Sequence, residues 1–498
     1  MSAPAASSHW RALRDGWIVP VARRLDGAVD PSLAFQHAAS TGPALLLESG
    51  RHHSLTGRYS FIGVAPRLEV QADRSSLTVT HDDGRRERHT DLAPWTAVCR
   101  LARQHRAQPA PELPPFTGGF AGYVSYEARH WFERLPQRAA DDLGLPWLHW
   151  AWWNDVVAVD HVRHCTWIIS NAWPEGDPAR SLQHARDRVE RLTDRVCMAA
   201  HAPQASSELA PRAGTRLAPQ ISQTAFETMV RRAQAAIRTG DIYQANLAQR
   251  FSGRLAADPW QLYRSLRSIN PSPFACFVRL GRVTIAGGSP ERLLRVQDGV
   301  ADTRPIAGTR PRGATAQENL HQAVELILSE KERAEHIMLV DLERNDLGRV
   351  CDYGSVRVDE LMAIEAYSHV LHIVSNVRGR LRPSADALDA FAALFPGGTI
   401  TGAPKVRAME IIDALEPVAR GPYTGAVGYI GAAGAADFNI IIRSFVIADG
   451  QAHVHVGAGI VADSDPSREY AETLAKGAAL QRACEQASAV EPPVLAAA

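Results

Sequence analysis

The sequence predicts a large protein of mixed helices and strands in two regions. From Leu45 to Ser170 the segments are short, often apolar and separated by Gly and Pro, which favours β-strands joined by turns. From about Ser222 onward, stretches of helical periodicity alternate with strand-like runs. The chain has 498 residues, enough to bury a large core.

The bulk composition excludes several classes of protein. Lys plus Arg and Asp plus Glu both number 54, so the formal net charge is zero and a nucleic-acid partner is not expected. The six cysteines are scattered without a CxxC pair, which is typical of reduced cytosolic thiols. The N-terminal segment lacks the basic and apolar stretches of a secretory signal, and no apolar run reaches the ~18 residues of a membrane span. We therefore expect a cytoplasmic protein with no membrane partner.

The N-terminal region is expected to cover residues 1–200 and to end in a helix over Pro178–Ala200. Residues 201–220 are polar, contain three prolines and show no periodicity, so they are expected to form an exposed connector. Residues 221–485 then form the second region.

Several elements of the second region have clear sequence signals. AFETMVRRAQAAIRTG predicts a helix that ends at Gly240, and Glu318–Asp346 predicts one long helix. Val406–Pro417 predicts another helix, which the proline stops. FNIIIRSFVIADG and HVHVGAG are predicted to be strands that meet at a turn.

Two segments place acidic side chains three residues apart on predicted helices, where they share a face. These side chains are Glu332, Glu335, Glu469 and Glu472. Asp465 and Pro466 are suited to begin the second helix. Two such faces would suit Mg²⁺, which binds few carboxylates and keeps some waters. Because Lys331 and Arg333 are interleaved with the first pair, a solvated, salt-bridged helix explains the spacing equally well.

Two Gly-rich segments have backbone N–H groups that would suit carboxylates. FPGGTITGAPKVRAME runs into a helix, with Thr401 near the cap and with Lys405 and Arg407 adding positive charge. Residues Gly457–Gly459 offer a second set of donors. Ordinary tight turns would give the same patterns.

Two further residues are candidates for a site that holds an anion. Arg443, within the apolar segment IIIRSF, must find a partner, and this is either a substrate carboxylate or a structural acid. His372, within VLHIVS, is a candidate acid or base, although a histidine in an apolar segment is more often a core residue.

Taken together, these motifs resemble those of the chorismate-utilising enzymes. The resemblance rests on DIYQANLAQRF, GGSPERLL, TRPIAGTRPRG, KERAEHIMLVDLERNDLGRV, FPGGTITGAPKVRAMEIIDALEP and GAGIVADSDPSREYAETLAK. It covers about Ser222 to Leu480, and LLLESG, GRYSFIG and FTGGFAGYVSYE extend it more loosely into the N-terminal region. The family includes anthranilate synthase component I, aminodeoxychorismate synthase component I, and the isochorismate and salicylate synthases.

The resemblance implies an α+β fold with two β-sheets packed in a layered sandwich and helices outside. It implies that the four glutamates bind Mg²⁺, with Glu332 also among the catalytic residues, and that His372 is an acid or base near the leaving group. Thr401 is a further expected catalytic residue. The residues expected to bind substrate are Gln244, Ala307, Thr309, Tyr429, Arg443, Gly457, Ala458, Gly459 and Lys476.

Gln244 indicates which chemistry to expect. The isochorismate and salicylate branch has a Lys at this position as the base that activates water, whereas ammonia already has a free lone pair. Gln244 therefore favours amination over hydration.

The motifs conflict over which amination the chain performs. Aminodeoxychorismate synthases commonly have PIKGT, and the PIAGT of this chain, with Ala307, resembles anthranilate synthase. Asn246, Leu247 and Thr401 resemble the aminodeoxychorismate pattern, and Phe274 and Ala275 stand where feedback-regulated anthranilate synthases carry Tyr and Met. LLLES, in contrast, resembles their tryptophan-contacting segment. We expect aminodeoxychorismate synthase component I, with anthranilate synthase component I as the alternative.

No segment resembles a glutaminase module, whose reaction needs a Cys nucleophile and a His partner. The expected partners are therefore chorismate, ammonia and a separate glutamine amidotransferase subunit. A non-catalytic subunit that binds chorismate or tryptophan is a rival, but it would not need the complete set of acids, His372 and Arg443.

Overall fold

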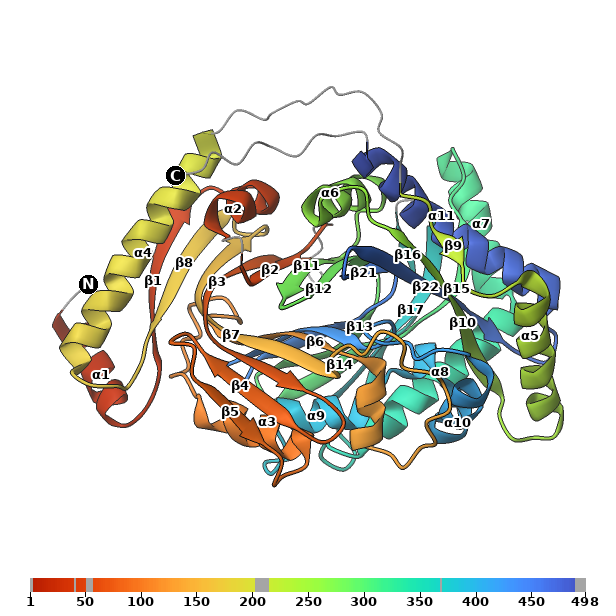
Figure 1. The fold of residues 1–498 in the computed structure, drawn as a ribbon, viewed down its shortest axis with the longest axis horizontal. Coiled ribbons are helices and arrows are strands. Elements are labelled where there is room, and N and C mark those ends of the chain that lie inside the picture. The colour runs from red at the N-terminus through yellow and green to blue at the C-terminus, as the bar shows by residue number, and fades with distance from the viewer. Residues whose placement is uncertain (1–2, 40–41, 51–56, 202–214, 368–369, 489–498) are drawn as a thin grey trace.

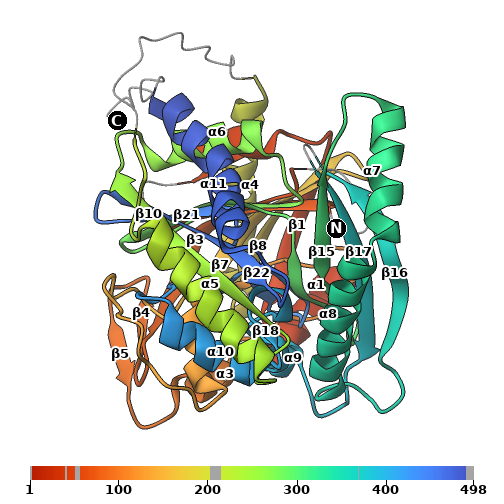
Figure 2. The same ribbon diagram turned by 90° about the vertical axis from the view of Figure 1, so that its right-hand side faces the viewer.

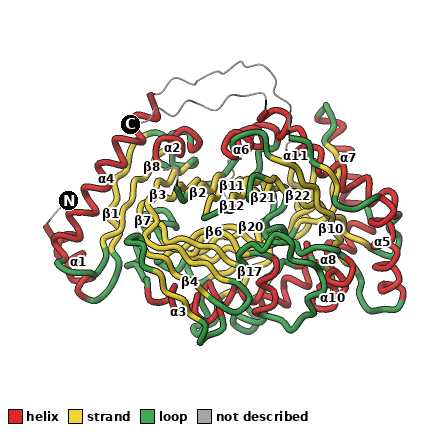
Figure 3. The backbone as a smooth tube through the Cα atoms, in the orientation of Figure 1, coloured by secondary structure: helices red, strands yellow, loops and turns green. Residues whose placement is uncertain are grey.

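The computed structural model describes residues 3–39, 42–50, 57–201, 215–367 and 370–488, and Figure 1 shows how their helices and strands are arranged. The 22 strands of this part of the chain join into one continuous network, and the pairing within it is antiparallel. The strands lie mainly inside and the helices outside, as the tube drawing shows (Figure 3). The expected α+β fold is thus confirmed.

The network forms two layers that share two long strands. The first layer pairs in the order β1 (Val19–Asp26), β8 (Cys165–Ala172), β7 (Leu148–Asp160), β3 (Tyr59–Ala72), β2 (Ala44–Glu48), β11 (Phe274–Leu280), β12 (Val283–Ser289), β21 (Ser444–Ala448), β22 (Gln451–Ile460), β10 (Gln244–Arg254) and β18 (Gly402–Ala403). A two-residue strand, β9 (Ala218–Pro219), also pairs with β10.

The second layer continues from the other halves of β3 and β7. Its order is β5 (Arg86–His89), β4 (Leu77–His81), β3, β7, β6 (Gly119–Val124), β19 (Ala426–Gly431), β20 (Ala436–Ile440), β13 (Arg292–Gln297), β14 (Val300–Arg304), β17 (Val370–Arg380) and β16 (Arg357–Ala366). β15 (Ile306–Pro311) follows β14 in the chain and also pairs with β17.

The two layers separate where β3 is irregular. Residues 59–63 of β3 face residues 156–160 of β7 in the first layer, and residues 68–72 face residues 148–152 in the second. The register shifts between Pro66 and Leu68, and Ala65 has a left-handed φ of 51°. Because a bulge bends and twists a strand, both strands can belong to both layers. The two packed sheets are therefore continuous with one another.

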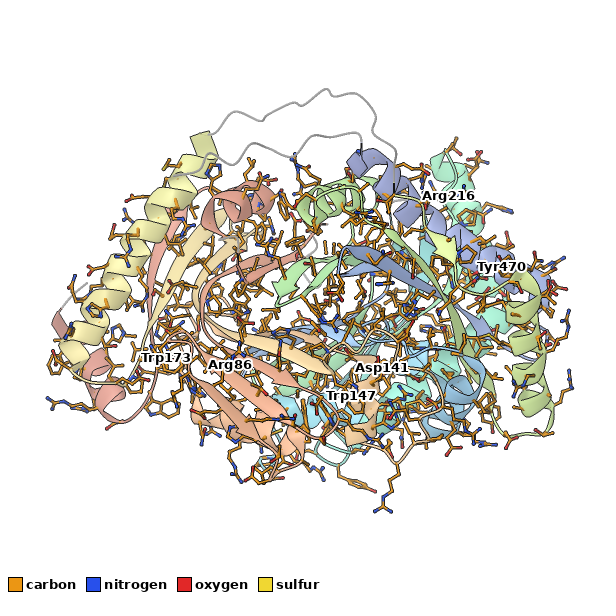
Figure 4. All side chains as sticks on the ribbon, in the orientation of Figure 1. Arg86, Asp141, Trp147, Trp173, Arg216 and Tyr470 are labelled. Atoms are coloured by element: carbon orange, nitrogen blue, oxygen red, sulfur yellow. The ribbon has the colours of Figure 1, made fainter. Side chains whose placement is uncertain are left out.

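The helices cover the outer faces of the layers. α4 (Pro178–His201) packs on β8 and β1, as expected for the helix predicted over Pro178–Ala200. α11 (Pro466–Ser488) lies on β22 and also contacts α5 (Gln223–Arg238) and α6 (Pro259–Ile269) (Figure 2). Tyr470 of α11, which is labelled in Figure 4, contacts Phe226 of α5, and their ring centroids are 5.9 Å apart. The remaining α-helices are α1 (Ala3–Arg14), α2 (Pro31–Ala38), α3 (Pro94–Gln104), α7 (Ala316–Leu328), α8 (Glu330–Gly348), α9 (Ala387–Leu394) and α10 (Lys405–Leu415).

The prediction of one long helix over Glu318–Asp346 is wrong, because the chain forms α7 and α8 with a break at Ser329. Ser329 has extended backbone angles and ends α7, and its hydroxyl accepts a hydrogen bond from the Glu332 N–H at 3.4 Å. A serine at this position is a good N-cap. The break places Glu332 and Glu335 in the first two turns of a new helix.

The prediction of one strand through FNIIIRSFVIADG is also wrong. β20 ends at Ile440 and β21 begins at Ser444, and Arg443 between them has a φ of 51°. A left-handed backbone at a non-glycine residue interrupts a strand and costs on the order of 1–3 kcal/mol. The turn predicted after this segment is present, with positive φ at Asp449 and Gly450.

The predicted connector lies largely outside the described residues, since its residues 202–214 fall in a gap. Of its remainder, Ala218–Pro219 forms β9, and the Gln220 N–H donates to the Arg250 carbonyl. In the described parts of the chain, no helix is both long enough and apolar enough to cross a bilayer.

A buried ion pair holds three segments of the second region together through hydrogen bonds. Arg420 and Glu416 are both buried and are joined by two hydrogen bonds of 2.7 and 2.8 Å. The Arg420 guanidinium also donates to the carbonyls of Ile400 and Asn246, and Glu416 accepts from the Ala248 N–H. The pair thus supplies hydrogen bonds to an edge of β10 that no strand covers there.

Glu416→Ala should therefore destabilise the protein by about 3–5 kcal/mol, because it leaves the Arg420 charge buried without its partner. Urea denaturation followed by circular dichroism would measure the change. Glu410→Ala is the matched control, since Glu410 pairs with Arg407 on the exposed face of α10 and should cost no more than about 1 kcal/mol. Equal effects of the two variants would contradict the role given to the pair.

Candidate functional site

Most of the predicted site residues come together where the two layers approach at β22 and β17. The contributing elements are β10 and β22 from the first layer, β15 and β17 from the second, and the N-terminal parts of α8 and α11. The pKa of His372 responds to Arg443 and Lys476, and the pKa of Glu335 responds to Glu469 and Glu472, so these segments form one electrostatic unit.

His372 is held in one tautomer. It is buried on β17, and its Nδ1 lies 3.1 Å from the Gly308 carbonyl and 3.0 Å from the Thr309 hydroxyl. Because a carbonyl only accepts, Nδ1 carries the proton and Nε2 presents a lone pair. Burial, reinforced by the Arg443 charge, lowers the pKa to about 4, so the ring is neutral at pH 7. Nε2 is buried and has no hydrogen-bond partner in the described structure, so it is available to a ligand.

Gly308 shows how closely this region is packed. Its φ is 70°, and a Cβ at this position would lie 3.0 Å from Glu332 Oε2. Both constraints favour glycine in PIAGT. Ala307 pairs with Ile373 and Thr309 with His372, so both residues lie on the strand beside the imidazole.

Arg443 brings a positive charge into the site without an acid bound to it. No salt bridge or side-chain hydrogen bond to its guanidinium is found in the described ranges, and the ionisable groups that act to raise its pKa are Tyr367 and, after it, Glu291. Loss of water lowers the pKa of Arg443. Burying such a charge costs folding free energy unless an anion pairs with it. Of the two partners expected from the sequence, the geometry favours a ligand carboxylate over a structural acid.

β10 and β22 together form a polar cradle. Asn246 faces Gly459 and Ala248 faces Gly457 in the ladder, and both glycines are required by packing. A Cβ at Gly457 would lie 2.5 Å from Asn246 Oδ1, and one at Gly459 would lie 2.6 Å from Gln244 Nε2. The Gln244 Oε1 and Asn246 Oδ1 atoms are buried and have no partner among the described residues.

The Gly457–Gly459 amides do not all face the same way. Lys476 Nζ donates to the Gly457 carbonyl at 2.8 Å, so the backbone polar groups of Gly457 point away from β10. Because backbone groups alternate in direction along a strand with a period of two, the N–H and C=O of Gly459 also point away from β10, and the N–H and C=O of Ala458 point toward it. Gly457 and Gly459 therefore present the two N–H groups that a carboxylate could use.

The four glutamates share one electrostatic environment, but no three acids, histidines or cysteines of the described chain converge into a ready metal-binding group. Glu332 pairs with Arg310 at 3.1 Å, Glu335 with Lys331 at 3.8 Å and Glu472 with Lys476 at 2.8 Å. Burial, together with the other three glutamates, raises the pKa of Glu335. Oxygen ligands of this charge fit Mg²⁺, which needs only some of them directly because it keeps several waters.

The sequence reasoning missed Glu291, within GGSPERLL. This carboxyl is buried, accepts from the Ile306 N–H at 3.4 Å and lies within electrostatic reach of Arg443. Burial raises the pKa of Glu291 to about 7, so a large fraction of the group holds a proton at pH 7, whereas an ordinary glutamate would be ionised. An acid kept protonated beside an anion site is suited to donate that proton. The adjacent Pro and Arg in the sequence gave no signal of this burial.

Tyr429 lies apart from the cluster. It is on β19, where its ring contacts Phe61 and Phe116, and its pKa responds to Asp437 and Arg292. A different tyrosine, Tyr423, lies in the cluster. Its hydroxyl is 2.9 Å from the position of a Cβ on Gly457, and its ring stacks on His455.

The segment before α10 differs from the expected capped helix N-terminus. The N-cap is Pro404, not Thr401, and the buried Thr401 hydroxyl donates to the carbonyls of Gly397 and Gly398. Lys405 binds Asp346 and Arg407 binds Asp241 and Glu410, so neither cation is directed at the cradle. The buried Thr399 hydroxyl, in contrast, makes no hydrogen bond of good geometry in the described structure, although it lies close enough to Glu291 to lower the pKa of that carboxyl.

A cavity of about 900 Å³ lies near β2, β11 and β19. Its lining includes Glu48, Ser49, Phe274, Ala275 and Tyr429. LLLES and NPSPFACF are the segments that were compared with the tryptophan-binding region of feedback-regulated anthranilate synthases. Residues of both line this cavity, and His372 does not.

The fold and the polar cluster define an enzyme that acts on chorismate. The chain belongs to the chorismate binding enzyme family, whose model matches residues 42–482. It is 39% identical over 481 residues to anthranilate synthase component 1 of Acetivibrio thermocellus, covering 96% of this chain and 97% of that protein. It is 41% identical over 445 residues to aminodeoxychorismate synthase component 1 of Bacillus subtilis, covering 88% of this chain and 93% of that protein.

Solved structures show the same fold. Anthranilate synthase component I from Streptococcus pneumoniae superposes with a TM-score of 0.75 at 34% identity, covering 86% of this chain and 94% of that one. The menaquinone-specific isochorismate synthase of Escherichia coli has a TM-score of 0.70 at 18% identity, covering 97% and 99% of the two chains, and shares the fold.

Arg443→Met should weaken chorismate binding strongly without destabilising the protein. Removing an unpaired charge from the interior does not weaken folding, whereas a ligand carboxylate loses a partner worth about 2–5 kcal/mol of binding. Isothermal titration calorimetry and urea denaturation would measure the two effects. Arg292→Met is the control, because Arg292 is buried in an ion pair with Asp437 and its loss should destabilise the fold. A large loss of stability in Arg443→Met would show that Arg443 is a structural residue.

Proposed function

We propose that this protein is aminodeoxychorismate synthase component I, which aminates chorismate with ammonia from a separate glutamine amidotransferase subunit and forms 4-amino-4-deoxychorismate. The observation that carries amination is the cradle of β10. Gln244 and Asn246 present amide oxygens that accept hydrogen bonds but cannot act as a base. Ammonia needs acceptors and no base, whereas water would need one.

Anthranilate synthase component I is the second candidate. Ala307 cannot form a covalent adduct with the substrate, and many of the similar proteins carry that name, including the one from Acetivibrio thermocellus. Asn246, Leu247 and Thr401 support the aminodeoxychorismate assignment, as does the similarity to the Bacillus subtilis protein. The two reactions differ in where the nitrogen ends and in whether pyruvate is lost.

Several groups of the chain would bind the substrate. Arg443 and the N–H groups of Gly457 and Gly459 would hold one carboxylate, and Lys476 lies beside them. Glu332, Glu335, Glu469 and Glu472 would hold Mg²⁺ near the ring carboxylate, and their present cations, Arg310, Lys331 and Lys476, would have to be displaced or shared. When bound, Mg²⁺ supplies positive charge that neutralises a substrate carboxylate and favours departure of the hydroxyl.

Two residues would carry out the proton transfers. Glu291, protonated near neutral pH, would donate a proton to the leaving C4 hydroxyl, which departs as water. His372 Nε2, with its free lone pair, would accept a proton from the amine nitrogen after the C–N bond has formed. The proton gained by the hydroxyl and the proton lost by the nitrogen balance, so the reaction neither consumes nor releases acid.

The identity of the product distinguishes between the two candidate reactions. The purified protein is incubated with chorismate, Mg²⁺ and ammonium, with and without aminodeoxychorismate lyase, and the products are separated by HPLC. We expect 4-aminobenzoate only when the lyase is present, and no product after chelation of Mg²⁺ with EDTA. Anthranilate formed without the lyase would assign the chain to anthranilate synthase instead.

The pH dependence tests Glu291. Since burial raises its pKa from 4.5 to about 7, the acid is protonated below this pH, and kcat at a fixed concentration of unprotonated ammonia should fall as the pH rises through about 7. Glu291→Gln should lower kcat by about 10²–10⁴-fold and remove this limb of the profile. A wild-type profile in Glu291→Gln would exclude it as the acid.

A further inference from the structure

Tyr367 packs against the imidazole of His372, and the reaction proposed above gives it no role. The two rings lie edge-to-face, with their centroids 5.3 Å apart and their planes at 67°. Rings at this separation and angle attract one another, because the positive edge of one meets the negative face of the other. Tyr367 is 9% exposed and His372 is 3% exposed, so water is largely excluded from the contact. The contact therefore restricts how far the imidazole can tilt.

Tyr367 is itself held at its hydroxyl and at its backbone. The hydroxyl donates a hydrogen bond to Glu365 Oε2 at 2.7 Å. The carbonyl accepts one from the Arg312 guanidinium at 3.0 Å, and the N–H donates one to the Val370 carbonyl at 2.8 Å. A ring that is fixed at both ends has a defined plane, so it can restrict a neighbouring ring.

Glu365 is anchored in turn by a buried arginine. Arg304 donates to Glu365 Oε1 from Nη2 at 2.5 Å and from Nε at 3.2 Å, and it also pairs with Glu360 at 2.6 Å. Glu365 faces His372 in the ladder between β16 and β17, so the two side chains lie on the same face of the sheet. Three direct contacts thus lead from Arg304 through Glu365 and Tyr367 to His372.

The hydrogen bonds of the imidazole leave a need for such a support. They involve only Nδ1, which lies 3.1 Å from the Gly308 carbonyl and 3.0 Å from the Thr309 hydroxyl. These bonds fix the tautomer, but they constrain the tilt of the ring weakly, because hydrogen bonds tolerate a broad range of angles. A tilt about Nδ1 moves Nε2, the atom that is available to a ligand. A side chain packed against the ring removes this freedom.

We propose that Tyr367 is a positioning residue, which is held by Glu365 and Arg304 and keeps the His372 imidazole in the orientation that directs Nε2 at the amine nitrogen. The inference rests on the proposed function, in which that lone pair accepts a proton from the new amine. It concerns the orientation of the ring and requires no proton transfer through Tyr367. Because a displacement of about 1 Å in a reacting group can lower a rate by about 10²-fold, the effect on turnover is measurable.

A purely structural role for Tyr367 makes a different prediction. Loss of a buried aromatic ring lowers the stability of a fold. If this were its only effect, the protein that remains folded would turn over normally, and His372 would keep its tautomer. Tyr123 is the matched control, because it is also buried and its ring lies edge-to-face with that of His149, with the centroids 6.1 Å apart.

The kinetic experiment compares the wild-type protein with Tyr367→Leu, Tyr367→Phe and Tyr123→Leu at equal concentrations of folded protein. We expect Tyr367→Leu to lower kcat by about 10–100-fold and to change the KM for chorismate by less than about twofold. Tyr367→Phe keeps the ring but loses the hydrogen bond to Glu365, so its kcat should lie between those of Tyr367→Leu and the wild type. Tyr123→Leu should be less stable and should keep the wild-type kcat.

Three kinetic outcomes would overturn the proposal. They are a wild-type kcat in Tyr367→Leu, an equal fall of kcat in Tyr123→Leu, and a rise in KM without a fall in kcat. If Tyr367→Leu does not fold, Tyr367→Phe decides the question, and a wild-type kcat in that variant would overturn the proposal.

Nitrogen-15 NMR of histidine-labelled protein tests the orientation of the ring without any reaction. The resonances of His372 are identified by their absence from His372→Gln. The wild-type protein at pH 7 should show one neutral tautomer with the proton on Nδ1, and Tyr123→Leu should keep it. Tyr367→Leu should add the tautomer protonated at Nε2, because a loosened ring no longer keeps Nδ1 at the Gly308 carbonyl. An unchanged single tautomer in Tyr367→Leu would contradict the positioning role.

The product assay with the wild-type protein separates the two inferences. Aminated product together with an unchanged tautomer in Tyr367→Leu would overturn the positioning role and leave the proposed function intact. Absence of aminated product would overturn the proposed function, whereas a change of tautomer in Tyr367→Leu would still show that Tyr367 holds the imidazole.

Discussion

The buried ion pair between Arg420 and Glu416 is the interaction on which the geometry of the site depends. Its hydrogen bonds reach Ile400 before α10, Asn246 and Ala248 on β10, and the turn that carries Tyr423. Each of these segments supplies or supports part of the cradle. Because a buried pair is stable only when both charges and all donors are satisfied, the segments are fixed relative to one another. The cradle can then remain rigid although its own polar atoms lack partners.

Unsatisfied polarity distinguishes the site from the rest of the interior. Gln244, Asn246, Thr399 and His372 each have a buried side-chain atom without a hydrogen-bond partner among the described residues, and Arg443 has a charge without an acid. Buried groups of this kind weaken folding. A polar ligand with both a carboxylate and hydrogen-bond donors would satisfy Arg443 and these acceptors together, and the energy gained on binding would offset what folding loses. The left-handed backbone at Arg443 also weakens folding.

The sequence predicted the elements more reliably than their ends. It identified α4, α5 and α10, the start of α11 at Asp465 and Pro466, and a few of the strands, among them β22. It joined α7 to α8 and β20 to β21, because helical periodicity continues through Ser329 and apolar residues continue through Arg443. A single serine cap and a single left-handed residue interrupt these elements, and neither changes the pattern of hydrophobic residues. For the site, motif and spacing selected residues that the fold brings together, but they selected Tyr429 while the fold places Tyr423 beside Gly457.

The sequence by itself determined the α+β class, the family and most of the residues that gather around His372, because these depend on local periodicity and on motifs that are contiguous in the chain. Only the tertiary structure decided that β3 and β7 join the two layers, that Lys405 and Arg407 point away from the cradle, and that Glu291 and Glu343 are buried acids. The physical reason is that burial and charge pairing depend on residues distant in sequence. A glutamate is written the same way in the sequence whether its carboxyl is in water or buried beneath Gly398, and only the surrounding fold decides whether that carboxyl holds a proton.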